Sequence, residues 1–390
     1  MSWTDAPDGI PAPPDREPRA RMSRGKTLLF LTIGILVPLV IGVGVLELLF
    51  GSWVRVDPWE AANRLNIIRD RHVVYQVGNL YGPGTESVVY SRDAHGLRGG
   101  CKEPGKIRIL SVGGSTTDQR YIGDGQTFQD RLQQRLEKTL QRPVCIANAG
   151  VDGHSTFGHL AAFDHWFPRI PDLKPAYVLL YIGINDAGLR DQPNAGFDDP
   201  TGRRVGVWAV IKERSAIFAA VRKLSFVVTG LYTKKAYAGH ALRPPTPGEY
   251  TETALSPGVE PLIARNGEAF RARLEQLLEK TRALGAKPIC VTQPHRFVAT
   301  TPEGVKGTAN VFEHQGRFYN GLDYATSLQV LNGVMRTVCP QAGGVFIDIA
   351  AQPFELADFY DPVHLTPTGA VRLGGYLFDA FAAQGVIAGL

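Results

Sequence analysis

The sequence predicts a three-layer α/β/α domain that follows one transmembrane helix. Short runs that are almost entirely apolar alternate along the chain with amphipathic stretches of helical period. A strand that is apolar on both faces has to be covered on both faces, which is typical of a parallel sheet between two layers of helices. One apolar segment near the N-terminus is long enough to cross a bilayer.

We expect the sheet to contain five parallel strands. The expected strands, all rich in apolar residues, lie at residues 106–114, 143–150, 176–186, 287–294 and 345–350. Helices are expected where apolar residues recur at helical spacing, at residues 128–141, 264–284 and 368–384. The regular part of the chain therefore spans residues 91–390 as one domain.

The first 50 residues predict a cytoplasmic tail and a membrane anchor. Residues 1–26 are rich in proline and charge, and they include the basic residues Arg16, Arg19, Arg21, Arg24 and Lys26. Within the expected anchor at residues 27–50, the nineteen residues 28–46 carry no charge. No small-residue cleavage site follows, so we expect an uncleaved anchor and not a signal peptide or a core helix. Because basic residues favour the cytoplasmic side, the rest of the chain is expected outside the inner (cytoplasmic) membrane, in a periplasmic or extracellular position.

Two intervals do not fit the alternation of strands and helices. Residues 51–90 are mixed and polar, and they predict either a stalk or a covering layer of strands and loops. An insertion at about residues 189–261 is apolar, basic and rich in proline. We expect extra helices packed on the domain there, with a lid or a membrane-facing surface as the alternative.

Composition argues against several classes of protein. Of the 390 residues, 44% are hydrophobic and 20% are charged, as in a folded globular protein. The net charge of +5 is modest and no basic patch is interleaved with aromatic residues, so we expect no nucleic-acid partner. The four cysteines, Cys101, Cys145, Cys290 and Cys339, lack zinc-type spacing. We expect them to be buried thiols, although one disulfide is possible if the domain lies outside the cytoplasm.

Four motifs predict chemistry at the carboxyl edge of the sheet. They are GGSTTD at residues 113–118, NAGVDG at 148–153, GIND at 183–186 and YDPVHLTPTG at 360–369. Open α/β sheets bind their ligands at this edge. A serine hydroxyl needs an adjacent base to become a nucleophile, and His364 can supply one. Asp361 lies three residues before His364 and can hold the imidazole in one tautomer.

Together the four motifs resemble those of the SGNH (GDSL-like) hydrolases, in their membrane-anchored bacterial form. The resemblance covers nearly all of the regular part of the chain and implies a three-layer, flavodoxin-like fold. It implies that Ser115 is the nucleophile of a triad with His364 and Asp361. It also implies an oxyanion hole made by the N–H groups of Ser115 and Gly150 and by the side-chain amide of Asn185. The leading motif reads GGSTT instead of GDS, which leaves the subfamily open.

The remaining carboxylates near the motifs are expected to have structural roles. Asp118 and Asp186 are the last residues of the first and third motifs, and we expect them to support the site without touching the substrate. They could also converge with Asp361 and His364 on a metal ion. Because a serine mechanism leaves no task for a metal, we expect neither a metal nor another cofactor.

The expected function is the hydrolysis of a carboxylic ester through an acyl-enzyme on Ser115. For an anchored domain outside the cytoplasm, the expected substrate is an acetyl group on a cell-envelope or exported carbohydrate, or another small ester. An O-acyltransferase would use the same triad, and a lysophospholipase or thioesterase would suit an acyl groove in the insertion. A non-catalytic scaffold in an envelope assembly is a further alternative, against which the intact motifs count.

Overall fold

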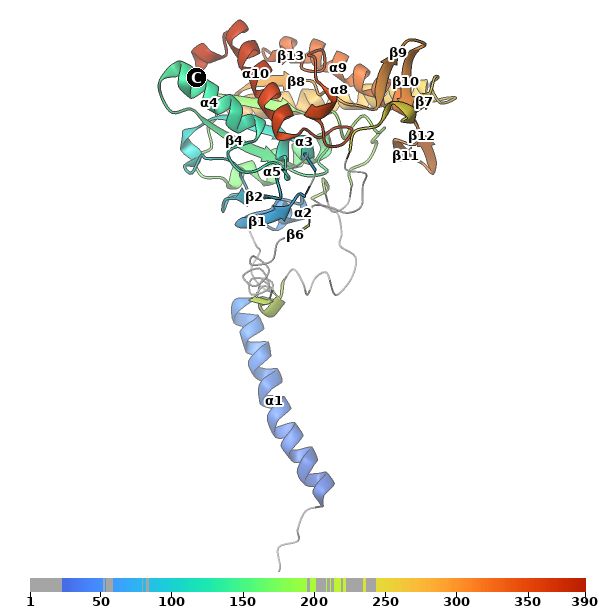
Figure 1. Ribbon diagram of the computed structural model, residues 1–390. Coiled ribbons are helices and arrows are strands. Elements are labelled where there is room, and N and C mark those ends of the chain that lie inside the picture. Colours follow the sequence, from blue (N-terminus) through green and yellow to red (C-terminus); the bar gives the residue numbers. More distant parts are fainter. Residues whose placement is uncertain are drawn as a thin grey trace, which may run out of the picture.

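Figure 1 shows the computed structural model of the chain, in which a domain with helices on both sides of a sheet follows one long N-terminal helix. The structure describes residues 23–51, 53, 59–78, 80–81, 84–194, 197–200, 208, 211, 214–218, 220–221, 234–235 and 243–390. Most of the expected N-terminal tail and a large part of the expected insertion lie outside the described residues.

A five-stranded parallel sheet forms the centre of the domain. Its strands, in spatial order, are β13 (Val345–Ile347), β8 (Lys287–Val291), β5 (Tyr177–Tyr181), β3 (Ile107–Gly113) and β4 (Cys145–Gly150). Because β3 pairs with both β4 and β5, the order of the strands reverses at β3. Ligand sites of open α/β sheets lie at such a point, beyond the carboxyl ends of the strands. The predicted flavodoxin-like sheet is confirmed.

Helices cover both faces of this sheet and bury a separate apolar cluster on each. α4 (Phe128–Leu140) and α10 (Pro367–Ala383) pack on one face. α5 (Thr156–His165), α8 (Glu260–Ala283) and α9 (Gly321–Gln341) cover the other face. The sequence predicted α4, α8 and α10, which have clear polar faces. It did not predict α5, which is short and largely buried, or α9, in which glycine and β-branched residues weaken the helical pattern.

Short antiparallel strands and single turns of 3-10 helix, which the sequence did not predict, connect the main elements. The strands form two small sheets beside the domain (Figure 1), and they are β7 (Tyr250–Glu252), β9 (Val298–Thr301) and β10 (Gly304–Thr308), then β11 (Phe312–His314) and β12 (Arg317–Tyr319). The 3-10 turns are η1 (Pro104–Lys106), η2 (Phe167–Arg169), η3 (Pro247–Glu249), η4 (Leu356–Asp358) and η5 (Ile387–Gly389).

The N-terminal helix α1 (Arg24–Phe50) projects away from the domain (Figure 1). A window of 18 residues within its segment Leu28–Phe50 has a mean hydropathy of 2.7, and none of the residues in that window is buried. The exposed surface of a soluble protein does not carry such a continuous apolar helix. By its length and composition, α1 could be a membrane anchor or a signal sequence.

The segment between α1 and the sheet packs on the domain as a covering layer. It contains α2 (Glu60–Arg64), β1 (Arg71–Gln76) and β2 (Ser87–Arg92). β1 pairs with β2 and also with β6 (Lys234–Lys235) from the insertion. Leu65, just after α2, is fully buried in the main apolar cluster. Of the two structures expected for this interval, the covering layer fits its described residues.

The four cysteines form two disulfides, Cys101–Cys145 and Cys290–Cys339. Their Cα atoms are 5.5 and 6.3 Å apart, which lies within the range that a disulfide requires. The expectation of buried thiols was therefore wrong. The sequence could not reveal the pairs because the fold brings each one together across more than forty residues, the second between β8 and α9.

Candidate active site

Ser115, His364 and Asp361 form a hydrogen-bonded chain at the carboxyl edge of the sheet. Ser115 is the first residue of the one-turn helix α3 (Ser115–Asp118), close after β3. The Ser115 Oγ and the His364 Nε2 are 2.7 Å apart, and the His364 Nδ1 and the Asp361 Oδ2 are 2.6 Å apart. The fold thus brings a serine and a histidine that are 249 residues apart in sequence into hydrogen-bond contact.

The turn that carries Asp361 and His364 is held by its own hydrogen bonds. The Asp361 Oδ1 accepts the backbone N–H groups of Val363 and His364, at 2.8 and 2.7 Å. The Tyr360 N–H donates to the His364 carbonyl at 3.0 Å, and the Tyr360 ring stacks on the imidazole with the ring centroids 5.5 Å apart. An aspartate that binds the backbone two and three residues later stabilises a tight turn. The carboxylate and the imidazole are therefore fixed relative to each other without a ligand.

The charge of Asp361 makes His364 a stronger base than an ordinary histidine. Burial by itself would lower the pKa of His364, but the charge of Asp361 and its hydrogen bond outweigh burial and raise that pKa. Burial would likewise raise the pKa of Asp361, and the contacts with His364 lower it instead. A carboxylate in this position also selects the tautomer in which Nδ1 carries the proton, so that Nε2 can accept the proton of Ser115.

The raised pKa of His364 predicts the pH dependence of the reaction. The imidazole must be neutral to accept a proton, so kcat/KM should rise with pH, with a midpoint above the usual value of about 6.5 for histidine. In Asp361→Asn the charge that raises this pKa is removed, and the midpoint should move to lower pH. We expect that variant to lose also about 10²- to 10⁴-fold in kcat. A pH profile of p-nitrophenyl acetate hydrolysis measures both effects, and an unchanged midpoint would contradict the assignment.

Asn185 lies beside the Ser115 turn, beyond the end of β5. Its Nδ2 donates to the His154 carbonyl at 2.8 Å, which leaves the second N–H of the amide for another acceptor. A Cβ on Gly114 would lie 2.5 Å from this Nδ2, so the site requires glycine immediately before Ser115. The absence of a side chain at Gly114 allows the amide to lie next to the serine, where a developing oxyanion needs a donor.

The backbone N–H of Gly150 is not available to an oxyanion, which corrects the expectation from the sequence. It donates to the Asn148 Oδ1 at 2.8 Å, within the same strand. A Cβ on Gly150 would lie 2.2 Å from the Asp118 backbone nitrogen, so glycine is needed there for close packing against α3. Gly150 therefore packs against α3 and does not supply a donor. We call the turn Ser115–Asp118 the nucleophile turn, after the role expected for Ser115.

Gly153, the second glycine of NAGVDG, has the free donor that Gly150 lacks. The His154 N–H donates to the Val151 carbonyl at 3.1 Å, and Gly153 has a φ of +81°, as at the third position of a type II turn. Among the residues that the structure describes, the Gly153 N–H has no hydrogen-bond partner. Sequence reasoning missed this residue, although the pair of glycines in one motif was a signal that could have identified it.

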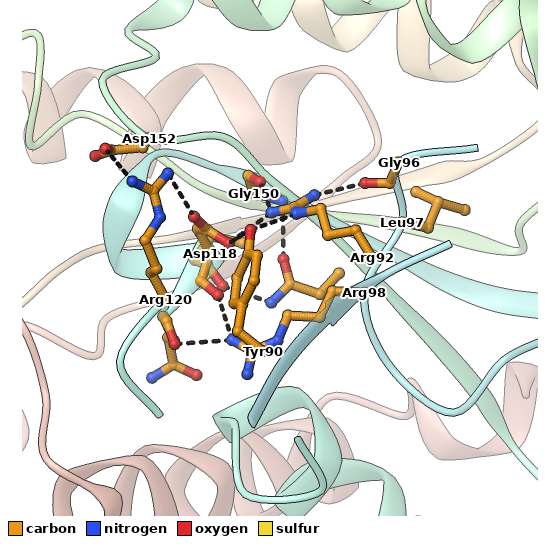
Figure 2. A network of polar contacts seen from close by, with 12 residues as sticks. Tyr90, Arg92, Gly96, Leu97, Arg98, Asp118, Arg120, Gly150 and Asp152 are labelled. Atoms are coloured by element: carbon orange, nitrogen blue, oxygen red, sulfur yellow. Dashed lines mark hydrogen bonds and ion pairs between the residues drawn. The ribbon is translucent and has the colours of Figure 1, made fainter. Parts of the chain in front are cut away.

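Figure 2 shows a buried polar network that joins the nucleophile turn to the covering layer. The Arg92 Nη2, from β2, donates to the Asp118 Oδ1 at 2.6 Å and to the Gly150 carbonyl at 2.5 Å. The Tyr90 hydroxyl donates to the same Asp118 oxygen at 2.9 Å. The Arg92 and Asp118 side chains are only 2% and 1% exposed. Because Asp118 ends α3 and Gly150 ends β4, one guanidinium fixes the nucleophile turn relative to the loop that carries Gly153.

A second arginine extends this network towards the solvent (Figure 2). The Arg120 Nη2 is 3.4 Å from the Asp118 Oδ2, and the Arg120 Nη1 is 3.2 Å from the Asp152 Oδ2. Burial by itself would raise the pKa of Asp118, but the charges of Arg92, Arg120 and Arg98 outweigh burial and lower it. Asp118 is therefore ionised at neutral pH, and its charge is balanced by arginines.

Asp186 is also bound within the fold and does not face Ser115. Its Oδ1 accepts the Thr156 hydroxyl at 2.5 Å and lies 3.5 Å from the Arg273 Nη2. These contacts attach the loop of Asn185 to α5 and α8. In the described part of the chain, no group of three histidine, cysteine, aspartate or glutamate side chains is placed to hold a metal ion. The possible convergence of Asp118 and Asp186 with the His364 pair does not occur.

At the carboxyl edge of a flavodoxin-like sheet, the hydrogen-bonded serine, histidine and aspartate form an arrangement that can activate a serine hydroxyl as a nucleophile. The sequence model of the GDSL-like lipase/acylhydrolase family matches residues 111–372, more than half of the chain. The chain therefore belongs to the GDSL-like lipase/acylhydrolase family. No curated protein matches it.

Several solved structures are similar to the chain at low sequence identity. A catalytic mutant of an acetylxylan esterase from Geobacillus stearothermophilus is 14% identical, with a TM-score of 0.37 over 73% of this chain and 94% of that one. The acetyl xylan esterase AlAXEase is 13% identical, with a TM-score of 0.36 over 70% and 99%. TesA is 14% identical, with a TM-score of 0.35 over 70% and 98%. At these values the substrates of the other proteins say nothing about the substrate of this one.

Proposed function

We propose that the protein is a membrane-anchored serine esterase that removes a small acyl group, acetyl in the first place, from a carbohydrate outside the cytoplasmic membrane. The observation that carries the chemical part is the continuous hydrogen-bonded chain from the Ser115 Oγ through His364 to Asp361. The carbohydrate is proposed from the location, because envelope and exported polysaccharides are acylated polymers that a domain outside the membrane can reach.

The proposed mechanism has two steps, each with one proton carried by His364. The Ser115 Oγ attacks the acyl carbon while the His364 Nε2 takes the hydroxyl proton. The oxyanion would be bound by the N–H groups of Ser115 and Gly153 and by the Asn185 amide. The C–O bond to the alcohol then breaks, and His364 gives its proton to the departing oxygen. Water repeats the sequence on the acyl-enzyme, releasing the carboxylic acid and free Ser115.

Removal of the Asn185 amide should affect the transition state more than substrate binding. For Asn185→Ala we expect kcat on p-nitrophenyl acetate to fall by about 10²- to 10³-fold, with little change in KM. Steady-state kinetics at a fixed pH measures this, and a thermal melt checks that the variant folds. A rise in KM with kcat unchanged would assign Asn185 to substrate binding and not to the oxyanion hole.

The proposed location rests on α1 and is supported by the disulfides. The basic residues before α1 favour a cytoplasmic N-terminus, so the domain after it would lie outside the membrane. Disulfides persist in oxidising compartments, which agrees with this side. We expect protease added to intact spheroplasts to digest the domain but to spare a tag on residue 1. Protection of the domain would reverse the orientation, and release of the domain into the soluble fraction would make α1 a signal sequence.

The function is tested on the full chain in detergent micelles with p-nitrophenyl esters and with an acetylated oligosaccharide. With p-nitrophenyl acetate we expect a burst of nitrophenolate followed by turnover, and faster reaction than with the butyrate ester if the acyl pocket is small. With an acetylated oligosaccharide we expect release of acetate. Transfer of acetyl to an added sugar hydroxyl in place of water would identify an O-acyltransferase. If the folded wild-type protein hydrolyses none of these esters, the esterase proposal is contradicted.

A further inference from the structure

A cavity of about 380 Å³ lies next to the catalytic turn, at the carboxyl ends of β8 and β13. Its volume is within the range of about 300–1,000 Å³ that is usual for small-molecule sites. The residues that line it include Gln293, Arg296 and Asn332, together with Phe354 and Phe359. None of them takes part in the mechanism described above.

The cavity is joined to the active site on two sides. The Thr116 hydroxyl, next to Ser115, donates to the Gln293 Oε1 at 2.7 Å. The Arg296 N–H donates to the carbonyl of Pro362, which lies between Asp361 and His364, at 2.7 Å. A ligand that contacts Gln293 and Arg296 would therefore bind residues that are hydrogen-bonded to the neighbour of Ser115 and to the turn of Asp361 and His364, which we call the catalytic turn. An extended substrate whose ester lies at Ser115 could place a neighbouring unit there.

The cavity contains buried polar groups without partners. Gln293 is 1% exposed, and its Nε2 has no hydrogen-bond partner among the described residues. The Asn332 Oδ1 and the Arg296 Nε are also buried atoms without a hydrogen-bond partner among the described residues. An unpaired buried donor or acceptor is costly, so such groups are usually found where a ligand or water completes them. The cavity thus offers donors and an acceptor that the fold leaves unused.

The lining chemistry selects a class of ligand. Side-chain amides both donate and accept hydrogen bonds, as sugar hydroxyls do, and Gln329 and Gln352 add two more amides to the wall. The partly exposed ring of Phe354 offers an apolar surface for the C–H face of a sugar ring. It packs against Phe359, with the ring centroids 5.8 Å apart, and the Arg296 guanidinium covers the buried Phe359 ring. No aspartate or glutamate is among the described residues that line the cavity, so it does not repel a sugar that carries a carboxylate.

We propose that this cavity is a sugar subsite, which binds a ring of the carbohydrate chain adjacent to the acylated unit. The inference rests on the proposed esterase function and names its substrate as a polymer or oligomer, not a free acetylated monosaccharide. The subsite would bind the unmodified ring through the amides of Gln293 and Asn332 and through the phenylalanine surface.

The test variant is Asn332→Leu, which replaces the side-chain amide by an apolar group of similar size. The control is Val330→Ala, at an exposed position of the same helix outside the cavity. We expect Asn332→Leu to lose about tenfold more in kcat/KM on acetylated xylo-oligosaccharides or oligogalacturonates than on p-nitrophenyl acetate, chiefly through KM. Val330→Ala should show no such difference. Gln352→Ala, at an exposed position of the rim, provides a second cavity variant if Asn332→Leu does not fold.

Binding of the deacetylated oligosaccharides, measured by titration calorimetry, separates the two proposals. If wild-type protein hydrolyses no ester but binds an oligosaccharide, and Asn332→Leu weakens that binding, the esterase proposal fails and the subsite stands. If p-nitrophenyl acetate is hydrolysed but no oligosaccharide is bound or hydrolysed, the subsite is refuted. Equal losses on the small ester and on the oligosaccharide would also refute it, because the variant would then act on the catalytic turn.

Discussion

Replacement of Ser115 by alanine is expected to lower kcat on p-nitrophenyl acetate by about 10⁴- to 10⁶-fold. Without the Oγ no acyl-enzyme can form, and the oxyanion donors alone stabilise only direct attack by water. The burst of nitrophenolate should therefore disappear completely. Binding of a substrate should be retained, because the Asn185 amide and the backbone donors are unchanged. Rapid-mixing kinetics together with mass spectrometry of the trapped acyl-enzyme measures the effect.

The double variant Ser115→Ala/His364→Ala sharpens this prediction. Because the two side chains act as one unit, the double variant should be no slower than Ser115→Ala alone. If the fold-losses in kcat of the two single variants multiply in the double variant, His364 does not act through Ser115. Thr337→Ala, which removes an exposed hydroxyl on α9, serves as the control and should keep full activity. Residual burst kinetics in Ser115→Ala would exclude Ser115 as the nucleophile.

Loss of either Arg92 or Asp118 is expected to destabilise the domain by about 3–5 kcal/mol, because each single change leaves a buried charge without its nearest counter-charge. Arg92→Met leaves Asp118 with fewer balancing cations, and Asp118→Asn leaves the Arg92 charge without its carboxylate. The double variant should lose less than the sum of the two, since neither charge then remains. Denaturant unfolding of the four proteins gives the coupling free energy.

The same variants should also affect catalysis. Arg92 binds the Gly150 carbonyl and Asp118, so its loss removes one of the links between the nucleophile turn and the loop of Gly153. We expect the folded fraction of each variant to have a lower kcat than the wild-type protein. The midpoint of the pH profile of kcat/KM should stay at the wild-type value, because Asp361 is unchanged. The exposed pair Lys106–Glu103, in which both side chains are at least 67% exposed, is the matched control. Its removal should change stability by less than about 1 kcal/mol. A similar loss for both pairs would mean that burial of Arg92 and Asp118 has no special effect.

The family match leaves the covering layer unexplained, and the structure gives it a role. The match begins at residue 111, whereas Tyr90 and Arg92 belong to β2, nearer the N-terminus. These two residues hold Asp118, at the end of the nucleophile turn. A domain truncated just before β3 would therefore expose a buried aspartate and lose the contacts that hold Asp118 at the end of α3.

The sequence by itself determined the sheet and the residues that meet at its edge. Strands buried on both faces have a continuous apolar pattern, and the Asp361–His364 turn is specified within four residues. The carboxyl ends of parallel strands share one edge, so the order of the motifs was enough to place Ser115 and Asn185 near this turn.

Only the tertiary structure decided which backbone donor is free, which cysteines pair and what holds the nucleophile turn. Gly150 and Gly153 look alike in sequence, and they differ because the Asn148 side chain folds back on the first and not on the second. The disulfides and the contact of Arg92 with Asp118 join residues 26 to 49 positions apart. Such pairs leave no local pattern in the sequence. Hydrophobic periodicity predicts individual helices and strands, but it does not predict which distant residues come into contact when these elements pack.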